Sequence, residues 1–158
     1  MKKEAMTKAY MQENREAILA RYNAPHTKSN RPAILTKKQR KVLGVGKDLG
    51  KASVDNVRVA PRKVEIVLDT IRGKEVNEAK AILLYTKKIA APYISKLLES
   101  AIANAVNNNG MNPDNLFVAE CYTGQGMVFK RFMPAGKGSA RPILKRTSNI
   151  TVVVKERV

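Results

Sequence analysis

Apolar residues in the middle of the chain recur at the spacing of an α-helix. Four of them lie at positions i, i+3, i+4 and i+7, namely Val64, Val67, Leu68 and Ile71. This pattern predicts a helix that opens at Pro61 and is capped by Gly73. The same reasoning predicts a second helix over about 76–85 and a third, the longest, over about 89–109.

After residue 115 the apolar period changes to two. Segments 116–123 and 127–133 are rich in β-formers, and 143–155 ends in the alternation expected of a strand. A tip that bears Gly and Pro, 134–142, separates the last two segments. Residues 57–59 are predicted as a further short strand. Because a helical block is followed by a hairpin, the predicted fold class is α+β.

The predicted hairpin, about residues 126–145, has no clear core face. In its first strand Phe129 and Arg131 point to one side and Lys130 and Phe132 to the other, so both sides carry apolar and basic residues. A two-stranded ribbon alone is only marginally stable in water. We therefore expect the ribbon to project from the body and to be held by something outside it.

The N-terminal third has a different pattern of apolar and charged residues. A helix with a thin apolar face is predicted over 3–22, ended by Pro25, and the residues that follow are basic and loop-like. We expect residues 1–50 to form a basic extension that becomes ordered on a partner. Residues 51–158 are expected to form the folded domain.

The formal net charge of +17 is unevenly distributed. Residues 1–50 and 130–158 carry net +8 and +7, whereas 64–129 carries net −1. A near-neutral core with basic arms is typical of a protein whose arms follow a polyanion. No segment is apolar over about 18 residues and no aromatic anchors accompany the basic runs, so a membrane partner is not expected. We expect a cytoplasmic protein.

Candidate catalytic and metal-binding residues are few. One Cys, Cys121, and one His, His26, exclude a disulfide framework and a Cys/His zinc site. The Gly-rich segment 44–52 lacks the spacing of a phosphate-binding loop. Glu65 and Asp69 are a pair of like charge that we expect on a solvated helix face. We therefore expect no enzyme, no cofactor and no metal.

Basic clusters lie at predicted helix starts, at glycine turns and along the hairpin, whereas the third helix is nearly uncharged. Lys and Arg at such places can neutralise phosphates, and neighbouring hydroxyls can bind phosphate or ribose. The candidate nucleic-acid-binding residues are Arg58, Arg62, Lys63, Arg72, Lys74, Lys130, Arg131, Lys137, Arg141, Lys145, Arg146, Thr147 and Ser148. These features do not distinguish DNA from RNA.

Four motifs occur in the order of a known family and without large gaps. They are Val59-Ala-Pro-Arg-Lys63, Ile71-Arg-Gly-Lys74, Ser100-Ala-Ile-Ala-Asn-Ala105 and Lys145-Arg-Thr-Ser-Asn-Ile-Thr-Val-Val-Val154. Over about residues 51–158 the chain resembles the family of the bacterial large-ribosomal-subunit protein number twenty-two. Residues 1–50 have no counterpart in the compact pattern of that family.

The resemblance implies three helices packed on a small antiparallel sheet and a hairpin that passes through large-subunit rRNA. It also implies that the hairpin tip lines the polypeptide exit tunnel. The implied partners are 23S rRNA, neighbouring large-subunit proteins and the nascent polypeptide, and no homo-oligomer is expected. The implied tunnel-tip residues are Pro134, Ala135, Gly136, Lys137, Gly138, Ser139, Ala140 and Arg141.

The chain departs from the family pattern at the tip, where Ala135 and Ser139 stand in place of the usual arginines. Two functions remain open at this point. One is a structural ribosomal protein that organises rRNA and lines the tunnel. The other is an extra-ribosomal nucleic-acid-binding or architectural module.

Overall fold

The computed structural model describes residues 6–25, 35–46 and 48–157. His26 and the first residues of the predicted N-terminal helix lie outside them. The chain divides into two compact units, residues 1–47 and 48–158, and each is described by itself.

The described part of the first unit contains α1 (Lys8–Glu13), α2 (Arg15–Asn23) and α3 (Lys37–Leu43). The single helix predicted over 3–22 is therefore wrong in its continuity, because it is interrupted at Asn14. The apolar pattern does not predict α3. This helix begins with a capping box, in which Thr36 Oγ1 accepts from the Gln39 N–H and Gln39 Oε1 accepts from the Thr36 N–H.

The first unit has a small core of its own. Met11, Leu35 and Leu43 are buried together. Arg15 Nε donates to the Leu43 carbonyl at 3.1 Å, and Arg40 Nε donates to the Leu35 carbonyl at 3.2 Å. The first unit thus buries some apolar surface of its own, and its ordering on a partner stays a prediction.

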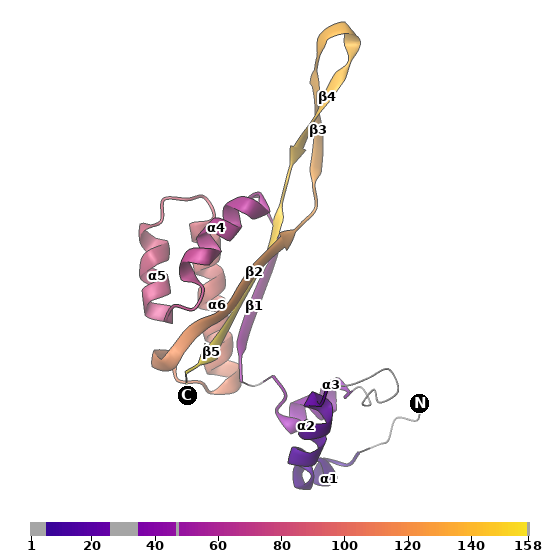
Figure 1. Cartoon of the computed structure of the whole chain (residues 1–158), viewed down its shortest axis with the longest axis vertical. Helices are drawn as coiled ribbons and strands as arrows, with labels where there is room; N and C mark the ends of the chain where they lie inside the picture. The colour runs from indigo at the N-terminus through magenta and orange to yellow at the C-terminus, as the bar shows by residue number, and fades with distance from the viewer. Residues whose placement is uncertain (1–5, 26–34, 47, 158) are drawn as a thin grey trace. The chain divides into compact units, whose positions relative to one another are not determined.

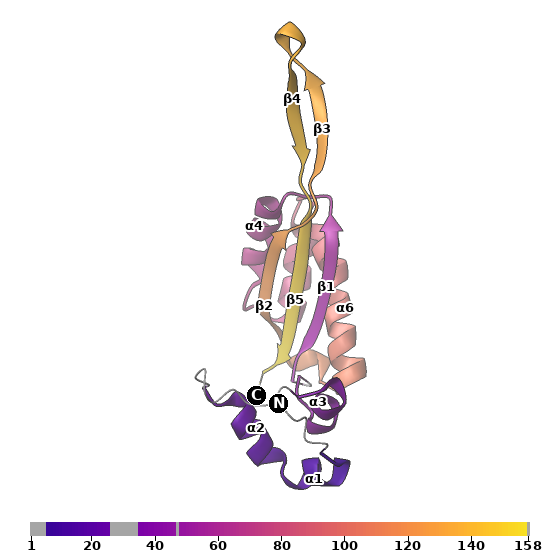
Figure 2. The ribbon, with the colours of Figure 1, turned by 90° about the vertical axis from the view of Figure 1, so that its right-hand side faces the viewer.

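The body of the second unit is a three-stranded antiparallel sheet with helices on one face (Figure 2). The strand order is β1 (Gly50–Val57), β5 (Ser148–Glu156) and β2 (Leu116–Gln125). In the central strand, Val152 pairs with Ala52 of β1 and with Cys121 of β2. The alternation predicted for β5 is confirmed, since Ile150, Val152 and Val154 are all fully buried.

The short strand predicted over 57–59 is misplaced, because β1 ends at Val57. The residues of β1 that face the helices include Gly50 and Ala52, which are too small to give a clear apolar alternation. They are small because α6 packs close to them: a Cβ added to Gly50 would lie 2.5 Å from the Cβ of Ala105.

The three predicted helices of this unit are confirmed as α4 (Pro61–Ile71), α5 (Val76–Tyr85) and α6 (Ala91–Asn109). The third begins slightly later than predicted, with Pro92 in its first turn. Leu68, Ile94 and Leu98 are fully buried in the core between the helices and the sheet. None of the described helices is both long and apolar enough to span a membrane.

A two-stranded hairpin extends from the end of the sheet, away from the helices (Figure 1). Its strands are β3 (Phe129–Pro134) and β4 (Ala140–Lys145), and all of their residues are exposed. The prediction of a projecting ribbon is confirmed.

Candidate nucleic-acid interface

A set of polar contacts joins the base of the hairpin to the sheet. We call it the root clasp, and it consists of Asn56, Gly126, Met127, Thr147 and Asn149. The Asn56 N–H donates to Asn149 Oδ1 at 2.9 Å, and Asn56 Oδ1 accepts from the Met127 N–H at 3.0 Å. Thr147 Oγ1 donates to the Met127 carbonyl at 2.6 Å. The clasp therefore ties β1 and β5 to the start of the hairpin.

Gly126 lies at the centre of the root clasp. Its N–H donates to the Thr147 carbonyl at 3.0 Å. A Cβ at this position would lie 2.4 Å from Thr147 Oγ1 and 2.9 Å from Asn56 Oδ1, so there is no room for a side chain. The close packing fixes the direction in which the hairpin leaves the sheet.

We expected Thr147 and Ser148 to contact phosphate or ribose through their hydroxyls, and that contact stays a prediction. Their side chains are buried, with exposed fractions of 1% and 0%. The Thr147 hydroxyl donates its hydrogen to the Met127 carbonyl within the root clasp. The Thr147 hydroxyl thus contacts the backbone at the start of the hairpin, whereas the buried Ser148 hydroxyl has no hydrogen-bond partner among the described residues.

The register of the hairpin sorts its side chains into two faces, because directly paired residues lie on the same side of a ribbon. The cationic face comprises Phe129, Arg131, Met133, Arg141, Ile143 and Lys145. The apolar face comprises Lys130, Phe132, Pro134, Ala140, Pro142 and Leu144. Both faces carry positive charge, as expected, but three of the four strand cations lie on one of them.

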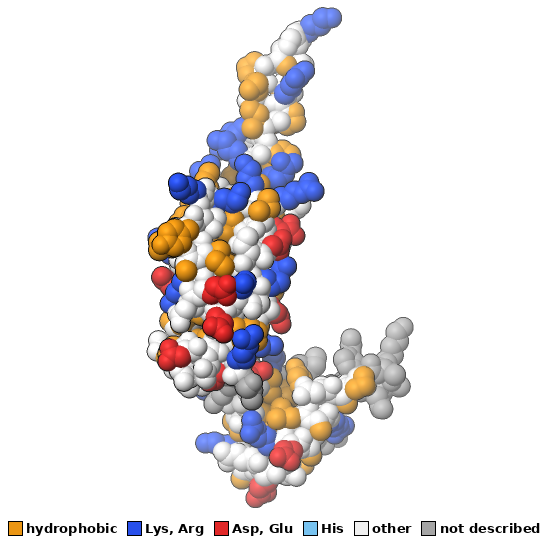
Figure 3. Space-filling view, turned by 60° about the vertical axis from the view of Figure 1, so that its left-hand side comes forward, with side chains coloured by type: hydrophobic (Ala, Val, Ile, Leu, Met, Phe, Trp, Pro, Cys, Tyr) orange, Lys and Arg blue, Asp and Glu red, His pale blue; other side chains and the backbone are white. Residues whose placement is uncertain are grey.

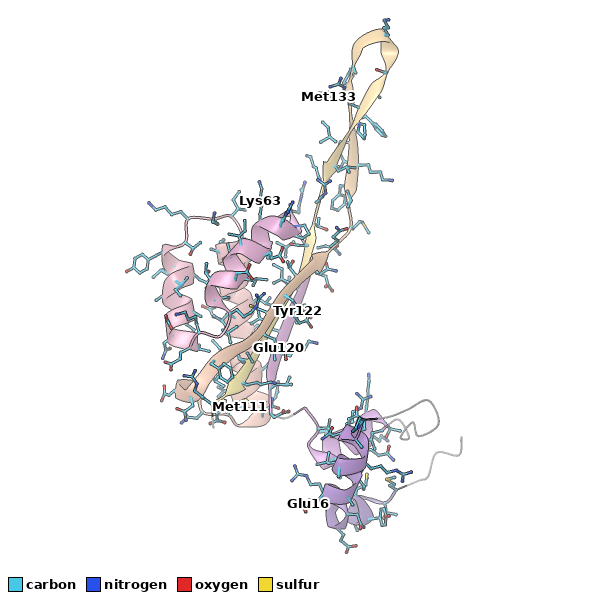
Figure 4. All side chains as sticks on the ribbon, in the orientation of Figure 1. Glu16, Lys63, Met111, Glu120, Tyr122 and Met133 are labelled. Atoms are coloured by element: carbon cyan, nitrogen blue, oxygen red, sulfur yellow. The ribbon has the colours of Figure 1, made fainter. Side chains whose placement is uncertain are left out.

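Further cations surround the root of the hairpin (Figure 3). Arg62 and Lys63 lie in the first turn of α4, which begins with Pro61 and has no acidic residue in that turn; Figure 4 labels Lys63. The unpaired N–H groups of a helix N-terminus favour anions, and the two cations reinforce that preference. The Arg58 guanidinium lies 6.0 Å from the centre of the Phe129 ring. These residues extend the basic surface from the cationic face onto the body.

Two of the candidate cations form ion pairs with acidic neighbours. Arg72 pairs with Asp69 and Lys74 with Glu78, each at 2.8 Å. Arg72 also donates to the Cys121 carbonyl at 3.0 Å. Arg72 and Lys74 therefore present less free charge than the candidates on the hairpin and at its root, none of which forms an ion pair within residues 6–25, 35–46 and 48–157.

The tip reverses the chain as the glycines predict. The Ala135 N–H donates to the Ser139 carbonyl at 2.8 Å, and Ser139 Oγ donates to the Gly136 carbonyl at 2.9 Å. Lys137 and Gly138 both adopt left-handed backbone conformations, with φ of 56° and 72°. The exposed Lys137 side chain thus lies at the turn itself, between the two strands.

Cys121 is part of the core. Its thiol donates to the Leu68 carbonyl at 3.4 Å, and burial raises its pKa above the ordinary value, with Arg72 acting in the opposite direction. A thiol held in its neutral form is a poor nucleophile. No group of three side chains suited to metal binding occurs in the part of the chain that the structure describes.

Comparison with known proteins places these features in a family. The family model described as ribosomal protein L22p/L17e matches residues 52–155, which include the root clasp and the whole hairpin. The chain is 59% identical over 124 residues to large ribosomal subunit protein uL22 of Acetivibrio thermocellus, covering 78% of this chain and 99% of that protein. It is 60% identical over 101 residues to the uL22 of Clostridium beijerinckii, covering 64% and 91%. The uL22 of Acholeplasma laidlawii is 54% identical over 107 residues, covering 68% and 96%.

Proposed function

The chain belongs to the ribosomal protein L22p/L17e family and is a structural constituent of the large ribosomal subunit, and from this premise we propose that it binds 23S rRNA through its hairpin and hairpin root. The observation that carries the proposal is a set of exposed cations on the hairpin and around its root, without acidic partners among the described residues. The set consists of Arg58, Arg62, Lys63, Lys130, Arg131, Arg141, Lys145 and Arg146.

Such cations bind phosphates and release counterions, which supplies affinity. The two faces of the hairpin contact the RNA differently. Arg131, Arg141 and Lys145 on the cationic face neutralise backbone phosphates. On the apolar face, Phe132 is 72% exposed, and its ring can stack on an unpaired base.

The tip lines the polypeptide exit tunnel and meets the nascent chain in this proposal. Its support is the family membership together with the geometry of residues 134–141, a narrow turn at the end of a projecting ribbon with Lys137 exposed. Ala135 and Ser139 have short side chains, so the tip presents less bulk to a tunnel wall than arginines would. The protein acts in the cytoplasm, within assembled subunits.

A shortened tip tests the tunnel role separately from rRNA anchoring. Replacing residues 135–139 by Asn-Gly keeps the pair of Pro134 with Ala140 and closes the strands with a two-residue turn. We expect normal subunit profiles by sedimentation, because the anchoring cations remain, together with an altered macrolide susceptibility or altered stalling of particular nascent chains. Unchanged drug response and stalling would reject the tunnel role, and failed assembly would show that the tip is an anchor.

A second variant supplies the reciprocal test. Arg62→Ala combined with Lys63→Ala removes two exposed cations at the root without touching a buried group. We expect fewer complete large subunits and an unchanged macrolide response in those that form. Normal assembly of this variant would contradict the assignment of the root as an rRNA-binding surface.

A further inference from the structure

The turn between α5 and α6 exposes an unusual amount of apolar surface. We call residues 84–93 the α5–α6 corner. Within it Leu84, Tyr85 and Ile89 are 81%, 82% and 76% exposed. On the described helices and sheet of this unit outside the corner, the large apolar side chains that are exposed are Ile66 at 55% and Tyr122 at 50%. The most exposed large apolar side chains of the described helices and sheet of this unit, and of the turns between its helices, are therefore gathered at this one place.

These side chains are not needed for the core. The buried residues of α5 are Val76, Ala79 and Leu83, which face the rest of the domain. Leu84 and Tyr85 follow that stripe and point away from it. Their exposure therefore has no explanation in the packing of the domain itself.

The backbone of the corner is held by hydrogen bonds and by buried neighbours. Thr86 Oγ1 donates to the Ile82 carbonyl at 2.7 Å, and the Lys88 N–H donates to the Thr86 carbonyl at 2.9 Å. Ala90 and Ala91 are buried at 2% and 3% exposure and anchor the turn against the core. A surface with a fixed backbone loses little conformational entropy when it binds a partner.

The chemistry of the corner favours a protein partner over RNA. Leu84 and Ile89 are aliphatic, so they neither stack on bases nor hydrogen-bond to phosphates. The corner contains no Arg, whereas the hairpin root contains Arg58, Arg62 and Arg146. Exposed Tyr residues beside aliphatic ones are typical of the centres of protein interfaces.

Charge indicates what the partner carries. Lys87 and Lys88 lie between the apolar residues, are exposed, and form no ion pair with the residues that the structure describes. Resting on the proposed function, we propose that the α5–α6 corner docks a segment of a neighbouring large-subunit protein. The segment covers Leu84, Tyr85 and Ile89 with apolar side chains and meets the two lysines with carboxylates.

Site-specific photocross-linking in assembled particles tests the proposal. The full chain carries p-benzoylphenylalanine in place of Tyr85. The fraction of this chain that sediments with large subunits is measured after a high-salt wash, alongside the same fraction for the unsubstituted chain. The purified subunits are then irradiated, digested and analysed by mass spectrometry. We expect an adduct with a protein segment that combines apolar residues with nearby Asp or Glu.

A matched pair of substitutions in the cross-linking chain sharpens the result. Ile89→Glu removes an apolar contact and repels carboxylates, so the adduct yield should fall on the order of tenfold. Ile66→Glu places the same charge on α4, outside the corner, and should leave the yield unchanged. Adducts with RNA alone, with a peptide that lacks carboxylates or with nothing would overturn the docking surface, as would an unchanged yield with Ile89→Glu. Absence of the unsubstituted chain from large subunits would overturn the proposed function as well.

Discussion

Replacing Gly126 by alanine removes the space on which the root clasp depends. The new Cβ would lie 2.4 Å from Thr147 Oγ1, 2.9 Å from Asn56 Oδ1 and 3.0 Å from Asn149 Oδ1. Carbon and oxygen atoms do not approach this closely without displacement. Thr147 must therefore rotate or shift, and its 2.6 Å hydrogen bond to the Met127 carbonyl is lost.

The loss can be estimated from two contributions. A buried hydroxyl left without a partner costs about 1–3 kcal/mol, and inserting a methyl group into a packed site costs about as much. Because both arise from one displacement, we expect the free energy of unfolding to fall by about 2–4 kcal/mol rather than by the full sum. Urea unfolding of the isolated chain, followed by circular dichroism, measures this change.

Gly124→Ala is the matched control, since no atom lies within 4 Å of a Cβ at that position. Its effect should stay within about 0.5 kcal/mol of zero. Thr147→Ala removes the oxygen that the new methyl group meets, so the Gly126→Ala and Thr147→Ala double variant should lose less stability than the two single losses added together. Equal stability of Gly126→Ala and Gly124→Ala, or strict additivity in the double variant, would refute the account of the clasp.

Three further changes have defined outcomes. Gly50→Ala should lower the free energy of unfolding in urea by about 1–3 kcal/mol, because its Cβ would lie 2.6 Å from the Ala101 carbonyl of α6; no loss would show that α6 can move aside. Burial raises the pKa of the Cys121 thiol above its ordinary value of 9.0, so the folded state keeps a proton that the unfolded state releases, and stability should fall as the pH rises above about 9. Cys121→Ala should lack that component when unfolding is compared at pH 7 and pH 10, and an identical fall in both chains would exclude the thiol as its cause. Deleting residues 1–47 should weaken binding to a large-subunit rRNA fragment and flatten its dependence on salt without changing the preference for that fragment; a lost preference would show that this unit reads RNA structure.

The elements with strong periodicity could be predicted from the sequence, and those built from small residues could not. The helix at Val64–Ile71 has four large apolar residues on one face, which leaves little choice of structure. Most of β1 could not be predicted, because its inward residues, Gly50 and Ala52, are small and give no apolar alternation. They leave space for the close approach of α6. That approach is a tertiary contact with residues about fifty positions away, and no local pattern records it.

The candidate site divides in the same way. Positive charge marks Arg62, Lys63 and the hairpin from the sequence alone, since charge needs no fold to be recognised. The burial of Thr147 and Ser148 could not be predicted, because burial depends on how the hairpin root packs against the sheet. The separation of the hairpin into two faces required the pairing of β3 with β4, which depends on the geometry of the tip.

The length of the hairpin turns the root clasp into the pivot of a lever. Six paired residues in each strand extend about 20 Å at about 3.4 Å per residue. A rotation of about 10° at the pivot would therefore sweep the far end through roughly 3.5 Å, about the thickness of one stacked base. The angle that the five residues of the root clasp set at the base of the hairpin thus determines the position of a turn that none of them touches.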